Sequence, residues 1–246
     1  MSCYVYAVTR DGHPLDIDGE KGVGAPPEPV RVLRSAGLAA VVSDAPEGLR
    51  AKRRDLEAHQ RVLDRLMGQG TALPMRFGTL ADSEDAVLAE LERSAQYYRG
   101  ELDRLDGRVE VNVKAAHLEE AALREALLTD PELRAANEEL RAAGGGTHDQ
   151  RIAFGEQVAD ALERLRGRDA DRVLEALRPH AERLALGPPV DGCLANVSLL
   201  VDRSRLREVD EAVQRLRAGT ADLMEVRVSE PLPPYSFVAP RPRQEQ

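Results

Sequence analysis

The strictest pattern in the chain is an alternation of polar and apolar side chains over residues 108–115. Its apolar members are Val109, Val111, Val113 and Ala115. A period of two places every second side chain on the same face, which is typical of a β-strand with one buried face. Helical periodicity lies on both sides of this strand, so the chain is expected to combine sheets with helices.

Several other segments have the composition of a strand. Segments 30–33 and 38–42 are short apolar runs on either side of Arg34-Ser35-Ala36-Gly37, which indicates a hairpin. Residues 10–29 contain several Gly and Pro residues and are expected to form a long loop. The remaining expected strands cover residues 3–9, 192–201 and 222–229.

Apolar residues that recur every three or four positions predict amphipathic helices. The first helix is expected over residues 51–67, where Gly68 and Gly70 follow it. Its expected buried face consists of Leu56, His59, Leu63 and Leu66. A second apolar stripe continues from about Ser83 to Leu105, and it predicts one long helix.

Cap signals mark further helices in the second half of the chain. Asp130-Pro131 joins an N-cap residue to a Pro at the first helical position. Thr147 and Gln150 have the spacing of a capping box. Pro179 is expected to split a later helical pattern, which Gly187-Pro188-Pro189 ends. The expected helices cover 117–128, 131 onward, 148–166 and 203–218.

This order of strands and helices predicts an α+β protein. We expect two packed lobes, each with a small, mainly antiparallel sheet and helices. The boundary is expected near Asp106-Gly107, which gives lobes at 1–106 and 107–230 and a Pro-rich tail at 231–246. Because Pro and Ser are absent from the boundary, it does not resemble a flexible linker, and the lobes are expected to pack closely.

Aromatic residues are scarce, since the chain has five Tyr, three Phe and no Trp. Phe77 lies in Leu73-Pro74-Met75-Arg76-Phe77-Gly78, and Tyr235 and Phe237 lie in the tail. Pro and Gly argue against a regular helix or strand in either segment. Aromatic groups on a Pro-stiffened backbone suit a binding surface or an interdomain seam, and Arg76 adds a permanent cation.

These segments also carry a family resemblance. Three motifs, Leu73–Thr79, Gly107–Lys114 and Pro233-Pro234-Tyr235-Ser236-Phe237, resemble in the same order those of the gas vesicle protein F/L family. The opening Cys3-Tyr4-Val5-Tyr6-Ala7-Val8 is similar to the first strand of that family. One departure is Asn112, where the family often has a Gly or another small residue.

The resemblance implies ferredoxin-like lobes and a non-catalytic accessory or minor structural protein of gas vesicles. Such a protein would bind the hydrophobic major shell protein, and other accessory proteins, during nucleation and assembly. It would belong to either the F or the L branch, in the cytoplasm and at the gas vesicle. The residues expected to form the interaction or structural motif are Leu73, Pro74, Met75, Arg76, Phe77, Gly78, Pro233, Pro234, Tyr235 and Phe237.

Composition and motifs argue against several other classes of function. The formal net charge of −9 does not suit a nucleic-acid binder, which needs a basic face. The sequence shows no spacing typical of a metal site, a catalytic triad or a phosphate loop, so we expect no cofactor and no enzymatic activity. We find no hydrophobic stretch of membrane-spanning length, and we expect no signal peptide. Cys3 and Cys193 are expected to be free and buried.

Two questions stay open at this point. One is whether the chain instead binds a small molecule, or is an enzyme, with Arg76 as an anion anchor between the lobes. The other is where the segment around Arg76 and the tail lie in the folded chain and what they contact. We expect Arg76 to be architectural between the lobes, with a packed stem and a hydrogen-bonded head. We expect the tail to be extended, with Tyr235 and Phe237 on one side and docked on the protein's own surface over a groove between the lobes.

Overall fold

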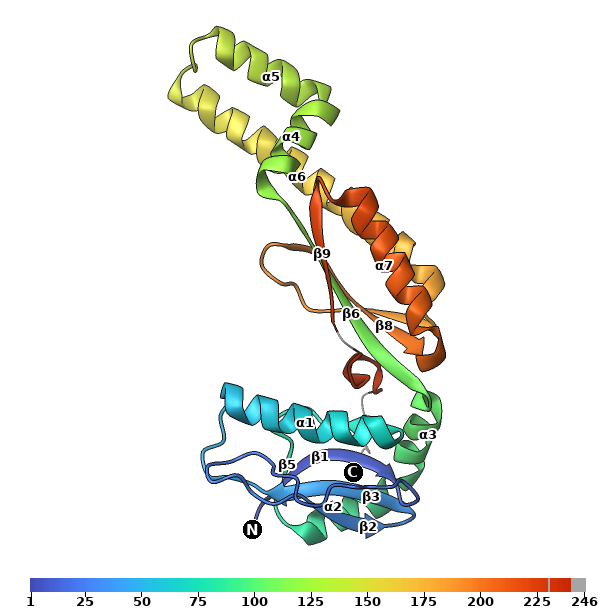
Figure 1. Cartoon of the computed structure of the whole chain (residues 1–246). Helices are drawn as coiled ribbons and strands as arrows, with labels where there is room; N and C mark the ends of the chain where they lie inside the picture. The colour runs from blue at the N-terminus through green and yellow to red at the C-terminus, as the bar shows by residue number, and fades with distance from the viewer. Residues whose placement is uncertain (230, 240–246) are drawn as a thin grey trace. The chain divides into compact units, whose positions relative to one another are not determined.

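A computed structural model describes residues 1–229 and 231–239, which divide into two compact units (Figure 1). Unit 1 contains residues 1–110 together with 231–239, and unit 2 contains residues 111–229. The division between the units falls inside a strand, after Glu110. The predicted α+β class is confirmed, because helices accompany a mainly antiparallel sheet in each part of the chain.

The sheet of unit 1 has the strand order β2-β3-β1-β4, and β5 also pairs with β1. Its strands are β1 (Cys3–Arg10), β2 (Arg31–Ser35), β3 (Leu38–Asp44), β4 (Ala72–Pro74) and β5 (Leu80–Ala81). The predicted hairpin is β2-β3, and its turn residues Ala36 and Gly37 have φ values of 51° and 68°. Two positive φ values are what a type I′ hairpin turn requires.

The helices of unit 1 are α1 (Arg53–Gln69), α2 (Glu84–Arg93) and α3 (Ala95–Leu105). The expected single helix from Ser83 to Leu105 is therefore wrong, because Ser94 interrupts it. The backbone of Ser94 leaves helical geometry, with φ −108° and ψ 18°, and its hydroxyl donates to the Glu90 carboxylate at 2.9 Å. The apolar stripe itself persists across the break, since Leu91, Tyr98, Leu102 and Leu105 are buried.

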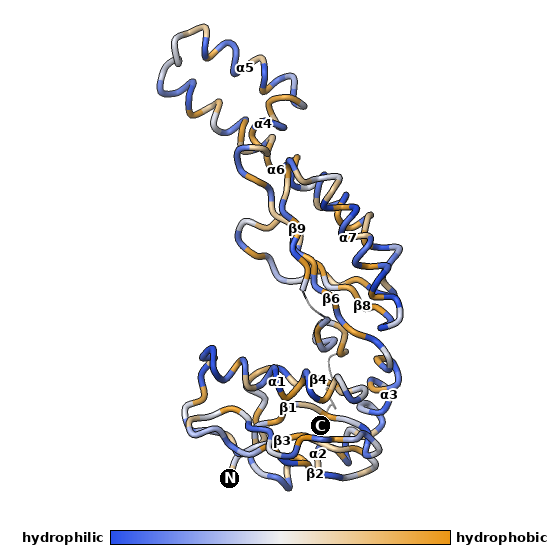
Figure 2. The backbone as a smooth tube through the Cα atoms, viewed as in Figure 1, coloured by the Kyte–Doolittle hydropathy of each residue, from blue (hydrophilic) through white to orange (hydrophobic). Residues whose placement is uncertain are grey.

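The core of unit 1 forms where α1 packs on the sheet. Its buried helix residues are Ala58, His59, Val62, Leu63 and Leu66, accompanied by Asp55. Leu56 was expected on this face but is 42% exposed. The buried stripe of α1 runs through Ala58, Val62 and Leu66, and Leu56 lies at its edge. Every residue of β1 before Arg10 is buried, and Figure 2 shows apolar residues along β1 and β3.

Unit 2 contains a four-stranded sheet in the order β7-β8-β6-β9. The strands are β6 (Arg108–His117), β7 (Arg183–Leu186), β8 (Cys193–Asp202) and β9 (Met224–Val228). The helices are α4 (Glu119–Thr129), α5 (Pro131–Ala142), α6 (His148–Leu177) and α7 (Leu206–Thr220). Helices α6 and α7 pack on the sheet around a core that includes Val113, Val173 and Val213. Helices α4 and α5 pack with the first part of α6 into a separate small cluster (Figure 1).

The predicted cap signals are confirmed in unit 2. The Asp130 carboxylate accepts from the Leu133 amide at 3.0 Å, and Thr147 and Gln150 form the reciprocal capping box. The expected end of the helix at residue 166 is wrong, because α6 continues through Gly167 to Leu177. Buried residues on both sides of Gly167, Leu165 and Val173 among them, outweigh the helix cost of a glycine, about 1 kcal/mol.

The segment after Pro179 is a strand and not the expected helix. Arg178–His180 forms a 3₁₀ turn that ends α6, and β7 then pairs with β8 in antiparallel register. The apolar residues of this short segment fit either period, and pairing with β8 decides between them. In the described residues, no helix combines the length and apolar character needed to cross a bilayer.

Candidate functional site

The first predicted motif, Leu73 to Gly78, begins as an edge strand and ends as a tight turn. Ala72–Pro74 is β4 and pairs with β1, so the expectation that this segment lies outside regular structure is wrong for its first half. Pro74 ends the strand, where a missing amide donor is tolerated. The Thr79 amide then donates to the Arg76 carbonyl at 3.1 Å, and Gly78 has φ 86°, which suits the third position of a type II turn.

The second motif lies in residues 231–239, called here the tail segment, and it packs on unit 1. Leu232 and Glu110 exchange two backbone hydrogen bonds of 2.9 and 2.7 Å. Tyr235–Phe237 then forms a 3₁₀ turn, so the expected extended conformation is wrong at the aromatic residues. Docking on the protein's own surface is as predicted, since Phe237 is 3% exposed and Tyr235 packs against the core of unit 1.

Glu110 holds the tail segment through its side chain as well. Its carboxylate accepts from the Ser236 amide at 2.8 Å and from the Ser236 hydroxyl at 2.7 Å. Farther along, the Ala239 amide donates to the Glu101 carboxylate at 2.9 Å, and Arg104 donates to the Phe237 carbonyl. The sequence places Glu110 on the polar face of its strand, but nothing in the sequence reveals that a distant segment covers that carboxylate.

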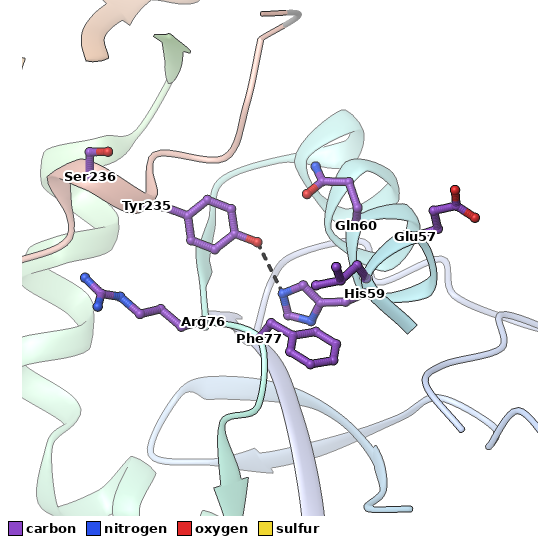
Figure 3. A pocket seen from close by; sticks show the side chains of 8 residues that line it. Glu57, His59, Gln60, Arg76, Phe77, Tyr235 and Ser236 are labelled. Atoms are coloured by element: carbon purple, nitrogen blue, oxygen red, sulfur yellow. Dashed lines mark hydrogen bonds between the residues drawn. The ribbon is translucent and has the colours of Figure 1, made fainter. Parts of the chain in front are cut away.

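The two motifs meet at His59, which is 3% exposed. The Tyr4 hydroxyl lies 2.8 Å from His59 Nδ1. The Tyr235 hydroxyl lies 3.2 Å from His59 Nε2 (Figure 3). The Phe77 ring packs edge-on against both Tyr4 and His59, with centroid distances of 5.9 and 5.8 Å. The Tyr6 ring stacks on His59 with a centroid distance of 5.6 Å, and we call Tyr4, Tyr6, His59, Phe77 and Tyr235 the aromatic cluster.

The ionisable members of the aromatic cluster are uncharged near neutral pH. Burial lowers the pKa of His59 to about 4, and burial raises the pKa of the Tyr4 and Tyr235 hydroxyls. The Gly78 amide donates to the Tyr4 hydroxyl, which leaves the Tyr4 proton free to reach His59 Nδ1. In the tautomer whose Nδ1 accepts from Tyr4, His59 Nε2 carries the proton and donates to the Tyr235 hydroxyl. His59 is thus the satisfied core histidine that its place on the apolar stripe predicts.

A hollow of about 620 Å³ opens beside the aromatic cluster. Leu56, Glu57 and Gln60 of α1 line it together with Arg76, Phe77, Tyr235 and Ser236. Leu56 is 42% exposed, and Phe77 and Tyr235 are half-buried. This surface offers aliphatic and aromatic groups that unit 1 leaves partly open to solvent.

The packed stem and hydrogen-bonded head expected of Arg76 are not found in the described residues. Its side chain is exposed, and in the described part of the chain its guanidinium makes no hydrogen bond or ion pair. Figure 3 shows the side chain extending away from the His59 ring. The neighbouring Phe77 packs on the core of unit 1, and the Met75 amide donates to the Tyr6 carbonyl at 2.8 Å, while Arg76 is left as a free cation at the edge of the hollow.

The other predicted motif residues fall into three groups by exposure. Gly78 is exposed and Met75 is half-buried; the buried members are Leu73, Pro74, Pro233, Pro234 and Phe237.

Chemically, the arrangement is suited to binding. Both nitrogens of His59 are occupied by tyrosine hydroxyls, and the Ser236 hydroxyl is occupied by Glu110. Among the described residues, no three His, Cys, Asp or Glu side chains form a possible metal site. Both cysteines are free, with Cys3 buried and Cys193 half-buried.

Comparisons with known proteins match nearly the whole chain. The model of the gas vesicle synthesis protein GvpL/GvpF family matches residues 2–239. Gas vesicle protein F of Streptomyces sp. (strain CB03234) is 48% identical over 97% of this chain and 100% of its own length. Gas vesicle protein L of the same strain is 33% identical over 95% of this chain and 91% of its own.

Solved structures share the fold. The crystal structure of GvpF from Anabaena sp. PCC7120 has a TM-score of 0.80 at 21% identity, covering 98% of this chain and 99% of that one. GvpF from Microcystis aeruginosa has a TM-score of 0.76 at 23% identity, covering 97% and 99%. At these identities the structural match establishes the fold.

Proposed function

The chain belongs to the gas vesicle synthesis protein GvpL/GvpF family, and we propose that it acts as a non-catalytic accessory or minor structural protein of gas vesicles. In this proposal it works in the cytoplasm and at the gas vesicle. It binds the hydrophobic major shell protein, and other gas vesicle accessory proteins, while the shell nucleates and grows.

The observation that carries the proposal is the hollow beside the aromatic cluster. A protein that handles a very apolar partner needs apolar groups it can present to solvent without unfolding. Leu56, Phe77 and Tyr235 meet that need, because α1 and the backbone hydrogen bonds of both motifs fix them in place. The net charge of −9 supports solubility while such groups are exposed.

The test is co-expression of the chain with the major shell protein, followed by co-purification under mild conditions. Leu56→Glu places a charge in the hollow at an exposed helix position and is expected to reduce the recovered shell protein. Leu128→Glu is the matched control, because Leu128 is a 62% exposed helix residue outside the hollow. Repeated failure of the unmodified chain to co-purify would contradict the proposed function. Equal recovery with both variants would place the contact on another surface.

A second candidate function is recognition of a small anionic molecule at Arg76. The specific observation in its favour is an exposed guanidinium without a partner in the described residues, next to an aromatic hollow. A thermal-shift screen against common metabolites and nucleotides tests it. A saturable shift with one ligand, lost in Arg76→Ala, would support this function over shell-protein binding.

A further inference from the structure

Unit 2 contains a second hollow, separate from the aromatic cluster. It has a volume of about 820 Å³, within the range of about 300–1,000 Å³ that small-molecule sites occupy. One wall comes from α4 and α6, and the other comes from β6, β9 and the loop that joins β7 to β8 (Figure 1). We call it the unit 2 hollow.

Two helices and a loop contribute aliphatic side chains to the unit 2 hollow. Helix α4 contributes Leu123, α6 contributes Val158 and Leu162, and the β7–β8 loop contributes Val190. Leu123 is 41% exposed and Val190 is 36% exposed, so the apolar surface continues to the mouth. Such walls would accommodate a hydrocarbon chain.

Two half-buried cations, Lys114 of β6 and Arg166 of α6, lie in the same lining. Neither makes a hydrogen bond or an ion pair within residues 1–229 and 231–239. Their neighbours on α6 behave differently, because Arg164 pairs with Asp130 and Arg168 pairs with Glu125. Removing a cation from water without a partner is unfavourable, so an anion bound between these walls would be stabilised.

The acidic residues of the lining do not neutralise the two cations. Glu119 and Asp191 are exposed, and Glu225 pairs with Arg227 at 2.7 Å. His117, also in the lining, pairs with the buried Asp169 at 2.9 Å. Lys114 and Arg166 are therefore the half-buried charged groups of the lining that an anion could pair with, although the net charge of the chain is −9.

From these observations we propose that the unit 2 hollow is a binding site for a small amphipathic carboxylate, a carboxyl group on a medium-length apolar chain. The chain packs on Leu123, Val158 and Leu162, and the carboxylate bonds to Lys114 and Arg166. This site is independent of the proposed contact between unit 1 and the shell protein.

Isothermal titration calorimetry on the full chain tests the proposal with decanoate, decanol and acetate as probes, each kept below its aggregation concentration. We expect saturable binding of decanoate, at least about tenfold weaker binding of decanol, and no measurable binding of acetate. The tenfold difference is the smallest effect expected from losing one charge-assisted hydrogen bond.

Variants locate the site. Arg166→Met and Lys114→Met are each expected to weaken decanoate binding about tenfold or more, whereas Arg151→Met, an exposed change on the same helix, should leave it unaltered. Val190→Glu places a negative charge at an exposed loop position and should weaken decanoate binding by repulsion. This variant tests the site even if Lys114→Met or Arg166→Met folds poorly. The proposal fails if decanoate does not saturate, if decanol binds equally well, or if Arg151→Met has the effect of Arg166→Met.

Discussion

Arg76 stands in a well-packed segment, yet its side chain is exposed and its guanidinium has no partner in the described residues. Arg76→Ala is therefore expected to change the free energy of unfolding by no more than about 0.5 kcal/mol, as for an ordinary surface substitution. If Arg76 contacts the partner, the same variant recovers less shell protein in co-purification.

Arg104→Ala is the contrasting variant for Arg76→Ala. Arg104 donates to Glu101 and to the Phe237 carbonyl, so its removal should destabilise the chain by about 1–3 kcal/mol. Thermal melts of both variants distinguish the two roles. A large loss of melting temperature in Arg76→Ala would restore the architectural interpretation.

His59 makes stability depend on pH in a defined direction. Its pKa is lowered to about 4 by burial, from an ordinary value near 6.5, so the unfolded chain binds the proton more readily than the folded one. Its contribution to stability is therefore complete above about pH 6.5 and is lost as the pH falls toward 4, by about 3 kcal/mol. Urea unfolding at pH 7 and pH 5 measures the first part of this loss, about 2 kcal/mol.

His59→Gln is the matching variant, because glutamine keeps hydrogen-bonding groups but does not titrate. The variant should be less stable than the unmodified chain at pH 7, and the difference should shrink at pH 5. Stability curves that stay parallel across this pH range would show that His59 is not the titrating group.

The tail segment is stabilised by contacts and not by its own secondary structure. Deletion of residues 231–246 removes the buried Phe237, the half-buried Tyr235 and the bonds to Glu110. Because burial of an aromatic side chain contributes roughly 1.5–3 kcal/mol, the truncated chain should melt at a lower temperature or become less soluble. A chain that ends at Ala239 keeps all these contacts and is the control. If the chain without residues 231–246 keeps the melting temperature of the unmodified chain, the tail segment contacts a partner instead.

Helix α6 contains an exposed glycine, Gly167, at its middle. Apart from its two neighbours and the backbone of its own helix, a methyl group added at this position would meet no atom within 4 Å. Gly167→Ala should therefore stabilise the chain by about 0.5–1 kcal/mol, through higher helix propensity and lower entropy of the unfolded chain. Urea unfolding measures the change. Destabilisation would indicate that the helix is interrupted at this glycine, as its sequence suggested.

For the molecule as a whole, salt distinguishes two kinds of contact with the shell protein. A contact through the apolar hollow of unit 1 should resist salt, whereas a contact through charged surfaces of this chain, whose net charge is −9, should weaken. If the hollow holds the shell protein, their association should survive about 1 M NaCl, where charges are screened beyond roughly 3 Å. Recovery of shell protein in washes of low and high salt measures this. Loss of the complex in high salt would indicate that charged surfaces dominate the contact.

The sequence by itself determined the features that depend on neighbouring residues. The alternation at residues 108–115 predicted β6, the caps at Asp130 and Thr147 predicted where helices begin, and the order of elements predicted the α+β class. Each of these rests on a period, a turn or a cap that operates over a few residues. The motifs that carried the family resemblance also lie in short continuous segments.

Tertiary structure decided what depends on distant partners. Pairing with β8 makes residues 183–186 a strand. Burial of residues on both sides of Gly167 lets α6 continue through that glycine. Phe77 and Tyr235 meet at His59, and Glu110 is covered by Ser236, although each pair is far apart along the chain. No local pattern encodes such contacts, because packing and burial act between surfaces that exist only once the chain has folded.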